Sequence, residues 1–394
     1  MPSHPHLSHP RLDDLHRSQQ RQPKPRRGFG DPIAPFKENP RFIPPPLTNL
    51  QNLKLPLRVI MPEEPINDAG RIVFHAVGDT GGVHGTDVQE AIAMQMEAQC
   101  DAADKGHKPS FLFHLGDVIY FNGQSALYPT EFYEPYQYYQ PYIFAIPGNH
   151  DGDTRVQSGD EPDTEPSLTG FIKNFCDTEP RPVTSWRDTM TQPYVYWTLD
   201  APFVTIIGLY SNVDGTLDGR GMNEQKQWLQ DQLKAASPEK CLVVAVHHPP
   251  YSLDRPHGGS PDIGIALDRA ITTTGRFPDA VFSGHVHSYQ RFTRTAGTRH
   301  IPYVVAGAGG YANTEKLMHK LQTQPDNEKI RTPFQTLAEG VTLESYNDTQ
   351  PGFLRVTVDK EALACEYFVV PFDGNPPAEP FDAFSLHWKR HTLA

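Results

Sequence analysis

Five short apolar runs, each ending in residues that commonly bind metal ions, constrain this chain more than any other feature. The clearest run, Phe111 to Leu115, has the length of a strand buried on both faces and stops at Gly116-Asp117. A carboxylate at the end of a buried strand is costly unless a cation receives it. Tyr120 follows three residues later, and its phenolate oxygen is a hard ligand suited to a highly charged metal. This stretch therefore predicts a metal-binding strand end.

Four further apolar runs end in the same way. They cover residues 72–77, 143–146, 242–246 and 280–282, and the potential ligands that follow them are, in order, Asp79, Asn149 with His150, His247, and His285 with His287. One histidine near a strand end is more often a hydrogen-bonded polar residue than a ligand, but five such endings in one chain favour metal binding. Because functional groups in open α/β folds gather at the carboxyl ends of strands, we expect these side chains to meet at one edge.

Helical patterns alternate with the predicted strands. Beyond the five runs, the pattern predicts helices at 87–103, 223–236 and 263–273, and strands at 194–199, 203–209 and 303–306. A closing hairpin is expected at 352–370, with its turn near Asp359-Lys360. This alternation predicts an α/β fold.

The first 66 residues differ from the rest of the chain. They are rich in Pro and almost lack a periodic apolar pattern. They also contain four histidines (His4, His6, His9 and His16), so the alternative to an irregular arm is a tail that loads metal. Residues 1–60 carry ten Lys and Arg against four Asp and Glu. We expect a largely irregular arm at 1–66 and one globular domain at 67–394, with regular structure beginning at Arg71.

Charge and cysteine content exclude several classes of function. The chain has 35 Lys and Arg against 47 Asp and Glu, so the part after the basic arm is strongly acidic. An acidic body argues against wrapping nucleic acid and suits cations.

Because no apolar stretch reaches the ~18 residues of a membrane span and no secretory signal is visible, we expect a cytoplasmic protein. The four widely spaced cysteines indicate buried thiols, with one disulfide left open.

The motifs resemble, in order and spacing, those of the calcineurin-like metallophosphoesterases. The matching stretches are Gly78-Asp79, Gly116-Asp117 with Tyr120, Gly148-Asn149-His150-Asp151, Val246-His247, and Gly284-His285-Val286-His287. The resemblance runs from about residue 71 to 310 and does not cover the first 65 residues. Many members begin with Asp-x-His, but here Asp79-Thr80-Gly81 lacks that histidine. In the purple acid phosphatase branch a tyrosine takes its place, so Tyr120 makes that branch the closest resemblance.

The resemblance implies a centre of two metal ions. The first would be bound by Asp79, Asp117, Tyr120 and His287, and the second by Asp117, Asn149, His247 and His285, with Asp117 bridging. His247 is preferred over His248 because the family ligand stands two residues before a proline, here Pro249. Carboxylate and phenolate oxygens favour Fe(III) at the Tyr120 site, while two imidazoles and an amide oxygen suit Zn(II), Mn(II) or Fe(II) at the second.

By the same resemblance, residues 67–394 would be a catalytic domain with a four-layer α/β/β/α sandwich, two mixed β-sheets flanked by helices. The implied activity is hydrolysis of a small phosphate ester, most simply a monoester, by metal-activated hydroxide attacking phosphorus in line. Two alternatives stay open. One is a phosphodiesterase acting on cyclic nucleotides or glycerophosphodiesters, and the other is a metal-containing scaffold protein without catalysis.

Further histidines are candidates for contact with substrate. His150 follows Asn149 directly, so we expect it to contact the phosphate and act as general acid, with Asp151 orienting it and keeping it cationic. The alternative is that His150 only supports Asn149. His257 falls near the position where this branch carries additional substrate-binding histidines. His84 could approach substrate from a Gly-rich loop, whereas we interpret three others as structural, namely His75, His114 and His248.

Overall fold

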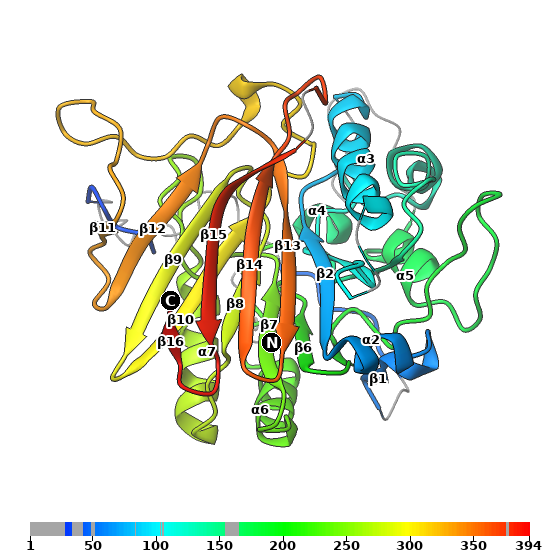
Figure 1. The fold of residues 1–394 in the computed structure, drawn as a ribbon, viewed down its shortest axis with the longest axis horizontal. Coiled ribbons are helices and arrows are strands. Elements are labelled where there is room, and N and C mark those ends of the chain that lie inside the picture. The colour runs from blue at the N-terminus through cyan, green and yellow to red at the C-terminus, as the bar shows by residue number, and fades with distance from the viewer. Residues whose placement is uncertain are drawn as a thin grey trace, which may run out of the picture.

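The computed structural model describes residues 28–33, 42–48, 52–82, 84–102, 104, 106–153, 165–375 and 378–394. Within these residues the chain forms two mixed β-sheets (Figure 1). The larger has nine strands in the order β1 (Lys54–Pro56), β5 (Trp197–Asp200), β6 (Val204–Leu209), β7 (Cys241–Val246), β8 (Ala280–Ser283), β10 (Arg299–Ala306), β9 (Tyr289–Ala296), β12 (Val341–Asn347) and β11 (Phe334–Gln335). The smaller has seven in the order β16 (Thr392–Leu393), β15 (Glu379–His387), β14 (Ala362–Val369), β13 (Gly352–Asp359), β2 (Arg71–Val77), β3 (Phe111–His114) and β4 (Tyr142–Ala145).

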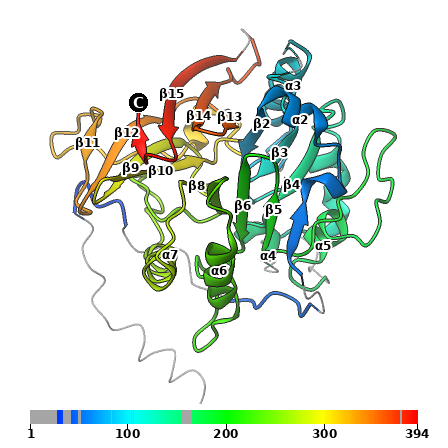
Figure 2. The same ribbon diagram turned by 60° about the horizontal axis from the view of Figure 1, so that its bottom comes forward.

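Helices cover the outer faces of both sheets. The α-helices of the described residues are α2 (Glu64–Ala69), α3 (Asp87–Ala102), α4 (Asn149–Gly152), α5 (Thr169–Phe175), α6 (Glu224–Ala235) and α7 (Pro261–Thr274). Short turns of other helix types are η1 (Leu57–Val59), η2 (Ser125–Leu127), η3 (Pro129–Tyr133) and η4 (Glu315–Leu317). Figure 2 shows α6 and α7 on one side of the sheets and α3 on the other.

Three apolar clusters hold these layers together. The sheets pack face to face through a core that includes Phe113 and Trp197, whose rings lie 5.9 Å apart. Ile92 of α3 belongs to a second cluster on the outer face of the smaller sheet. Leu229 of α6 and Leu267 of α7 belong to a third on the larger sheet. Burial of this apolar surface is the main driving force for the fold, and the four-layer α/β/β/α sandwich is confirmed.

Parallel pairing determines where the strands end. β2, β3 and β4 are parallel neighbours in the smaller sheet, and β6, β7 and β8 are parallel neighbours in the larger one. The carboxyl ends of each set therefore lie along one edge of its sheet. The loops that follow these ends carry every predicted metal ligand, which places the candidate site at this edge.

Regular structure begins earlier than the sequence indicates. β1 pairs in parallel with β5, and Leu55 and Leu57 belong to the core between the sheets. The expectation that regular structure begins at Arg71 is wrong, because a three-residue strand is too short to show a period. α2 also crosses the expected boundary between residues 66 and 67, and that boundary stays a prediction. Most of the expected arm, including its four histidines, lies outside the described residues.

The closing hairpin is confirmed. β13 and β14 pair antiparallel with Gly352 opposite Val369. At the turn, Asp359 Oδ1 accepts hydrogen bonds from the amides of Glu361 and Ala362 at 2.7 and 2.8 Å. β9, β12 and β15 are absent from the sequence prediction because polar residues interrupt the apolar pattern along them.

Two further expectations concern the cysteines and membrane-spanning helices. All four cysteines are free thiols, so the disulfide left open by the sequence is not present. None of the helices in the described part of the chain is long and apolar enough to cross a membrane.

The early start of the core can be tested with two leucines from the same region. Leu57 is fully buried, so Leu57→Ala should lower the free energy of unfolding by about 2–5 kcal/mol in urea denaturation. Leu47 is 98% exposed, so Leu47→Ala should change it by less than about 0.5 kcal/mol. Equal, small effects would contradict the inclusion of residues 54–59 in the core.

Candidate metal centre

The seven predicted ligands meet at the common edge of the strands. Each is buried, and each stands shortly after the strand that positions it: Asp79 after β2, Asp117 and Tyr120 after β3, Asn149 after β4, His247 after β7, and His285 and His287 after β8. Residues more than 200 positions apart are thereby brought into contact. The geometry divides them into two groups that share one residue.

The first, called the Tyr120 group, consists of Asp79, Asp117, Tyr120 and His287. Tyr120 Oη lies 3.3 Å from Asp79 Oδ1, 3.1 Å from Asp117 Oδ2 and 3.3 Å from His287 Nε2. His287 Nε2 is 3.6 Å from Asp79 Oδ1. Three oxygen donors and one imidazole nitrogen therefore converge on one point.

The second, called the Asn149 group, consists of Asp117, Asn149, His247 and His285. Asn149 Oδ1 lies 3.1 Å from His247 Nε2 and 2.8 Å from His285 Nδ1. His247 Nε2 is 3.2 Å from Asp117 Oδ2, the same oxygen that faces Tyr120. Asp117 Oδ2 thus belongs to both groups, as a bridging ligand would.

The backbone is strained at three of these residues. Asp79, Asp117 and His285 have φ angles of 59°, 52° and 68°, in the left-handed region that is unfavourable for residues with a Cβ. Such a conformation costs about 1–3 kcal/mol per residue and persists where the surroundings enforce it. Here the amide of His285 donates to Asp79 Oδ2 at 2.7 Å, so one ligand fixes the loop of another.

Two glycines permit the close approach of the loops. A Cβ on Gly148 would collide with Asp117 Oδ1 and with the Asp117 amide nitrogen. A Cβ on Gly284 would lie 2.6 Å from Asp79 Oδ2. Both glycines immediately precede a ligand, so their presence in the motifs is explained by space.

The donor set fits two cations. Burial raises the pKa of Asp79 well above its ordinary value; the His247 imidazole opposes this rise and the Asp117 carboxylate adds to it. Burial likewise raises the pKa of the Tyr120 phenol, and the Asp117 and Asp79 carboxylates raise it further. The anionic forms of these oxygens therefore need positive charge beside them. Carboxylate, phenolate, amide and imidazole donors in one buried site supply the ligand types for that charge.

His150 lies beside this centre, but Asp151 does not orient it. The His150 ring is 4.5 Å from that of Tyr120, and its Nδ1 donates to the carbonyl oxygen of Phe121 at 2.7 Å. The Asp151 carboxylate instead accepts from the amides of Gly148 and Val118 at 2.8 and 3.2 Å. The expectation for Asp151 is wrong because its side chain turns back over the first turn of α4, where amide donors are unsatisfied.

His257 is also brought to the centre. Its ring lies 4.7 Å from the His285 ring, and its Nδ1 is 3.3 Å from Asp254 Oδ2. The sequence analysis did not identify Tyr311 or His319, whose rings stack on Tyr120 and His287 at centroid distances of 4.0 Å each. Tyr311 directly follows Gly307-Ala308-Gly309-Gly310, a glycine-rich stretch that could have pointed to it, whereas His319 has no surrounding motif.

The remaining histidines have distinct environments. His84 is exposed, with its ring 4.9 Å from that of Tyr311. His75 is buried and hydrogen-bonded to Tyr139 Oη at 3.0 Å, and burial lowers its pKa to about 3. His114 lies 3.0 Å from Thr80 Oγ1, and the Nδ1 of His248 lies 2.7 Å from Ser211 Oγ. These three contacts agree with the structural interpretation of His75, His114 and His248.

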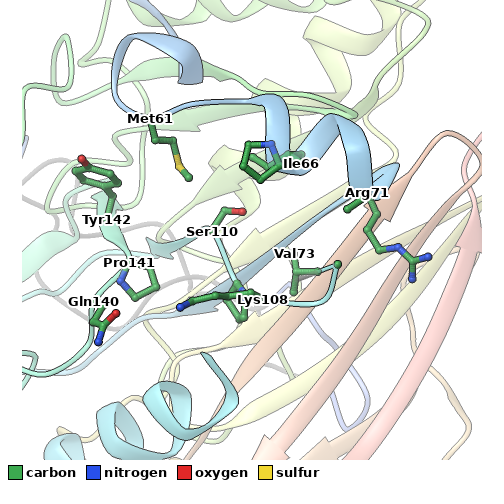
Figure 3. A pocket seen from close by; sticks show the side chains of 13 residues that line it. Met61, Ile66, Arg71, Val73, Lys108, Ser110, Gln140, Pro141 and Tyr142 are labelled. Carbon is green, nitrogen blue, oxygen red and sulfur yellow. The ribbon is translucent and has the colours of Figure 1, made fainter. Parts of the chain in front are cut away.

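A separate apolar cavity lies at the opposite ends of the strands. Its volume is about 360 Å³, and it is lined by Met61, which precedes α2, and by residues near the starts of β2, β3 and β4, among them Val73 and Tyr142 (Figure 3). It contains none of the seven candidate ligands. The residues predicted from the motifs therefore lie at the carboxyl ends of the strands and not in this cavity.

The chain is similar in sequence to known phosphoesterases and acid phosphatases. The sequence model of the calcineurin-like phosphoesterase family matches residues 72–289. Purple acid phosphatase 22 of Arabidopsis thaliana is 29% identical over 148 residues, which are 36% of this chain and 32% of the relative. Tartrate-resistant acid phosphatase type 5 of Homo sapiens is 24% identical over 307 residues, which are 75% of this chain and 86% of the relative.

The chain is also similar to a bacterial relative and to a solved plant structure. A probable glycerophosphodiester phosphodiesterase of Arcobacter nitrofigilis is 25% identical over 186 residues, which are 46% of this chain and 57% of that protein. The structure of a purple acid phosphatase from yellow lupin seeds superposes with a TM-score of 0.58 at 16% identity, covering 80% of this chain and 54% of the other, which is evidence for the fold. The chain matches about one third of the length of the plant relatives.

Metal analysis of variants tests the shared role of Asp117. Asp117→Ala should lose both metal ions, because Oδ2 lies in both groups, whereas His287→Ala should lose mainly the ion of the Tyr120 group. The measurement is metal content per chain by mass spectrometry of the purified proteins. Asp231→Ala on the exposed face of α6 is the control and should keep both ions. Full metal content in Asp117→Ala would contradict the bridging role.

Proposed function

The chain belongs to the calcineurin-like phosphoesterase family, and we propose that it hydrolyses phosphate monoesters at a centre of two metal ions. The observation that carries this proposal is the position of Asp117 Oδ2, 3.1 Å from Tyr120 Oη in one ligand group and 3.2 Å from His247 Nε2 in the other. A carboxylate shared by two donor sets would hold two ions close together, as two-metal hydrolysis needs.

Each group would contribute a defined part of the chemistry. Two bound cations would supply Lewis acidity toward the phosphoryl oxygens and a lowered pKa for an attacking water. The protein supplies fixed donors that are already in place, so little reorganisation accompanies the reaction. We assign the Tyr120 group to the first ion and the Asn149 group to the second.

His150 would serve the leaving group. Its Nδ1–H is used by the carbonyl oxygen of Phe121, so Nε2 is the nitrogen left to face substrate. When protonated, Nε2 can donate a proton to the departing ester oxygen. His257, held by the buried Asp254 carboxylate, would add a second imidazole near the phosphate. Cationic or donor groups of this kind suit the dianionic monoester.

We further propose Fe(III) at the Tyr120 group and Zn(II), Mn(II) or Fe(II) at the Asn149 group. Tyr120 Oη has two carboxylate oxygens within 3.3 Å, a set of hard oxygen donors that favours a trivalent ion. The Asn149 group has two imidazole nitrogens and an amide oxygen, which suit a divalent ion.

The second candidate function is that of a phosphodiesterase. It is supported by the similarity of this chain to a probable glycerophosphodiester phosphodiesterase. Turnover of p-nitrophenyl phosphate and of bis(p-nitrophenyl) phosphate by the metal-loaded protein separates the two. We expect kcat/KM at least tenfold higher for the monoester. A higher value for the diester would establish the second candidate, and no turnover of either by fully metal-loaded protein would indicate a scaffold.

The role of His150 has its own test. His150→Ala should keep both metal ions and lose about 10²–10⁴-fold in kcat, because general acid catalysis contributes that much. The loss should be smaller for p-nitrophenyl phosphate than for an alkyl phosphate, whose leaving oxygen needs the proton more. Loss of metal from His150→Ala would instead show that the residue only supports Asn149.

The iron assignment predicts a colour. Protein purified with iron should be violet, with a broad absorption band in the visible region, because a phenolate bound to Fe(III) gives a charge-transfer band. Tyr120→Phe should remove this band, while Tyr311→Phe, whose ring stacks on Tyr120, should retain it. A band that survives in Tyr120→Phe would rule out Tyr120 as the iron ligand.

A further inference from the structure

His319 lies beside the candidate metal centre, but it belongs to neither ligand group and to none of the sequence motifs. It follows η4 and is half-buried, and its ring stacks on the His287 ring at 4.0 Å with an interplanar angle of 17°. Its ring also lies 4.6 Å from that of His257. His319 therefore lies against both a ligand of the Tyr120 group, His287, and a proposed substrate contact, His257.

One hydrogen bond determines which nitrogen of His319 carries the proton. The backbone amide of His287 donates to His319 Nδ1 at 3.0 Å. An amide N–H can only donate, so Nδ1 must accept and is unprotonated in this arrangement. A neutral imidazole has one N–H, which is therefore on Nε2. His319 presents a hydrogen-bond donor without needing to be cationic.

A third metal ion is the competing interpretation of this cluster. Asp254, His257 and His319 each offer a ligand atom within 4.8 Å of the others. However, the Asp254 carboxylate already accepts from Ser252 Oγ at 2.9 Å and from the amides of Gly258 and His257 at 2.7 and 2.9 Å. The Nδ1 of His319 is occupied and its Nε2 is protonated. Neither Asp254 nor His319 therefore has a lone pair well placed for a cation.

We propose that His319 binds the phosphate group of the substrate, donating a hydrogen bond from Nε2–H to a phosphoryl oxygen. The contact with the His287 amide sets the ring relative to the Tyr120 group, so the bound phosphate is oriented against that group. For ester substrates this rests on the proposed function, but binding of inorganic phosphate measures the same contact without turnover.

The test compares two substitutions of His319 in the metal-loaded protein. His319→Phe keeps an aromatic ring but has no acceptor for the His287 amide and no donor for phosphate. His319→Gln can supply both a carbonyl acceptor and an amide donor. Lys316→Ala on exposed η4 is the control from the same segment. Isothermal titration calorimetry with inorganic phosphate gives Kd, and mass spectrometry gives metal content.

We expect His319→Phe to keep two metal ions per chain and to raise Kd for phosphate about 10- to 100-fold, since a hydrogen bond to a charged group is lost. His319→Gln should recover most of the affinity, and Lys316→Ala should match the unmodified protein. KM for p-nitrophenyl phosphate should rise in His319→Phe more than kcat falls.

The outcomes separate the two proposals. Unchanged phosphate affinity in His319→Phe overturns the inference, even if the protein is an active hydrolase. Loss of metal in His319→Phe, or a third ion lost with it, also overturns it, because the residue then supports or binds metal. A protein that hydrolyses no ester but binds phosphate through His319 would refute the proposed function and leave this inference standing.

Discussion

The Asp117 carboxylate is the contact on which the rest of the candidate site depends. Its Oδ1 accepts the amide of His150 at 2.9 Å and so fixes the loop after β4, while Oδ2 lies between Tyr120 and His247. Both oxygens are buried, and a buried carboxylate without positive charge would cost several kcal/mol. The surrounding loops are therefore arranged for cations, and the strained backbone at Asp117 belongs to the same arrangement.

The two sheets contribute different chemistry to this site. Loops of the seven-stranded sheet supply the oxygen donors, on Asp79, Asp117, Tyr120 and Asn149, whereas loops of the nine-stranded sheet supply the three imidazoles of His247, His285 and His287. Each group of four contains donors from both sheets. A complete site thus exists only when the sheets are packed against each other, so metal binding should favour the packed state.

The sequence predicted which side chains meet because each one follows an apolar run, and parallel strands place such ends together. It failed where long-range contacts decide a residue's role. Asp151 is adjacent to His150 in sequence, yet its carboxylate accepts hydrogen bonds from the amides of Gly148, at the start of α4, and Val118, after β3. β1 is three residues long, and only its pairing with β5 reveals it. His319 contacts His287, which is 32 residues away in the sequence, and no local sequence pattern predicts that contact.

His150, His257 and His319, three imidazoles beside the ligand groups, have different proton arrangements. In His150, Nδ1 faces the Phe121 carbonyl oxygen, and in His257 it faces the Asp254 carboxylate, so both Nδ1 atoms carry a proton. Their Nε2 atoms can donate only when the rings are cationic. In His319 the Nδ1 accepts, so Nε2 donates while the ring is neutral. His150 and His257 could therefore transfer a proton from Nε2 when cationic, whereas the arrangement of His319 suits binding of a phosphoryl oxygen by a neutral ring.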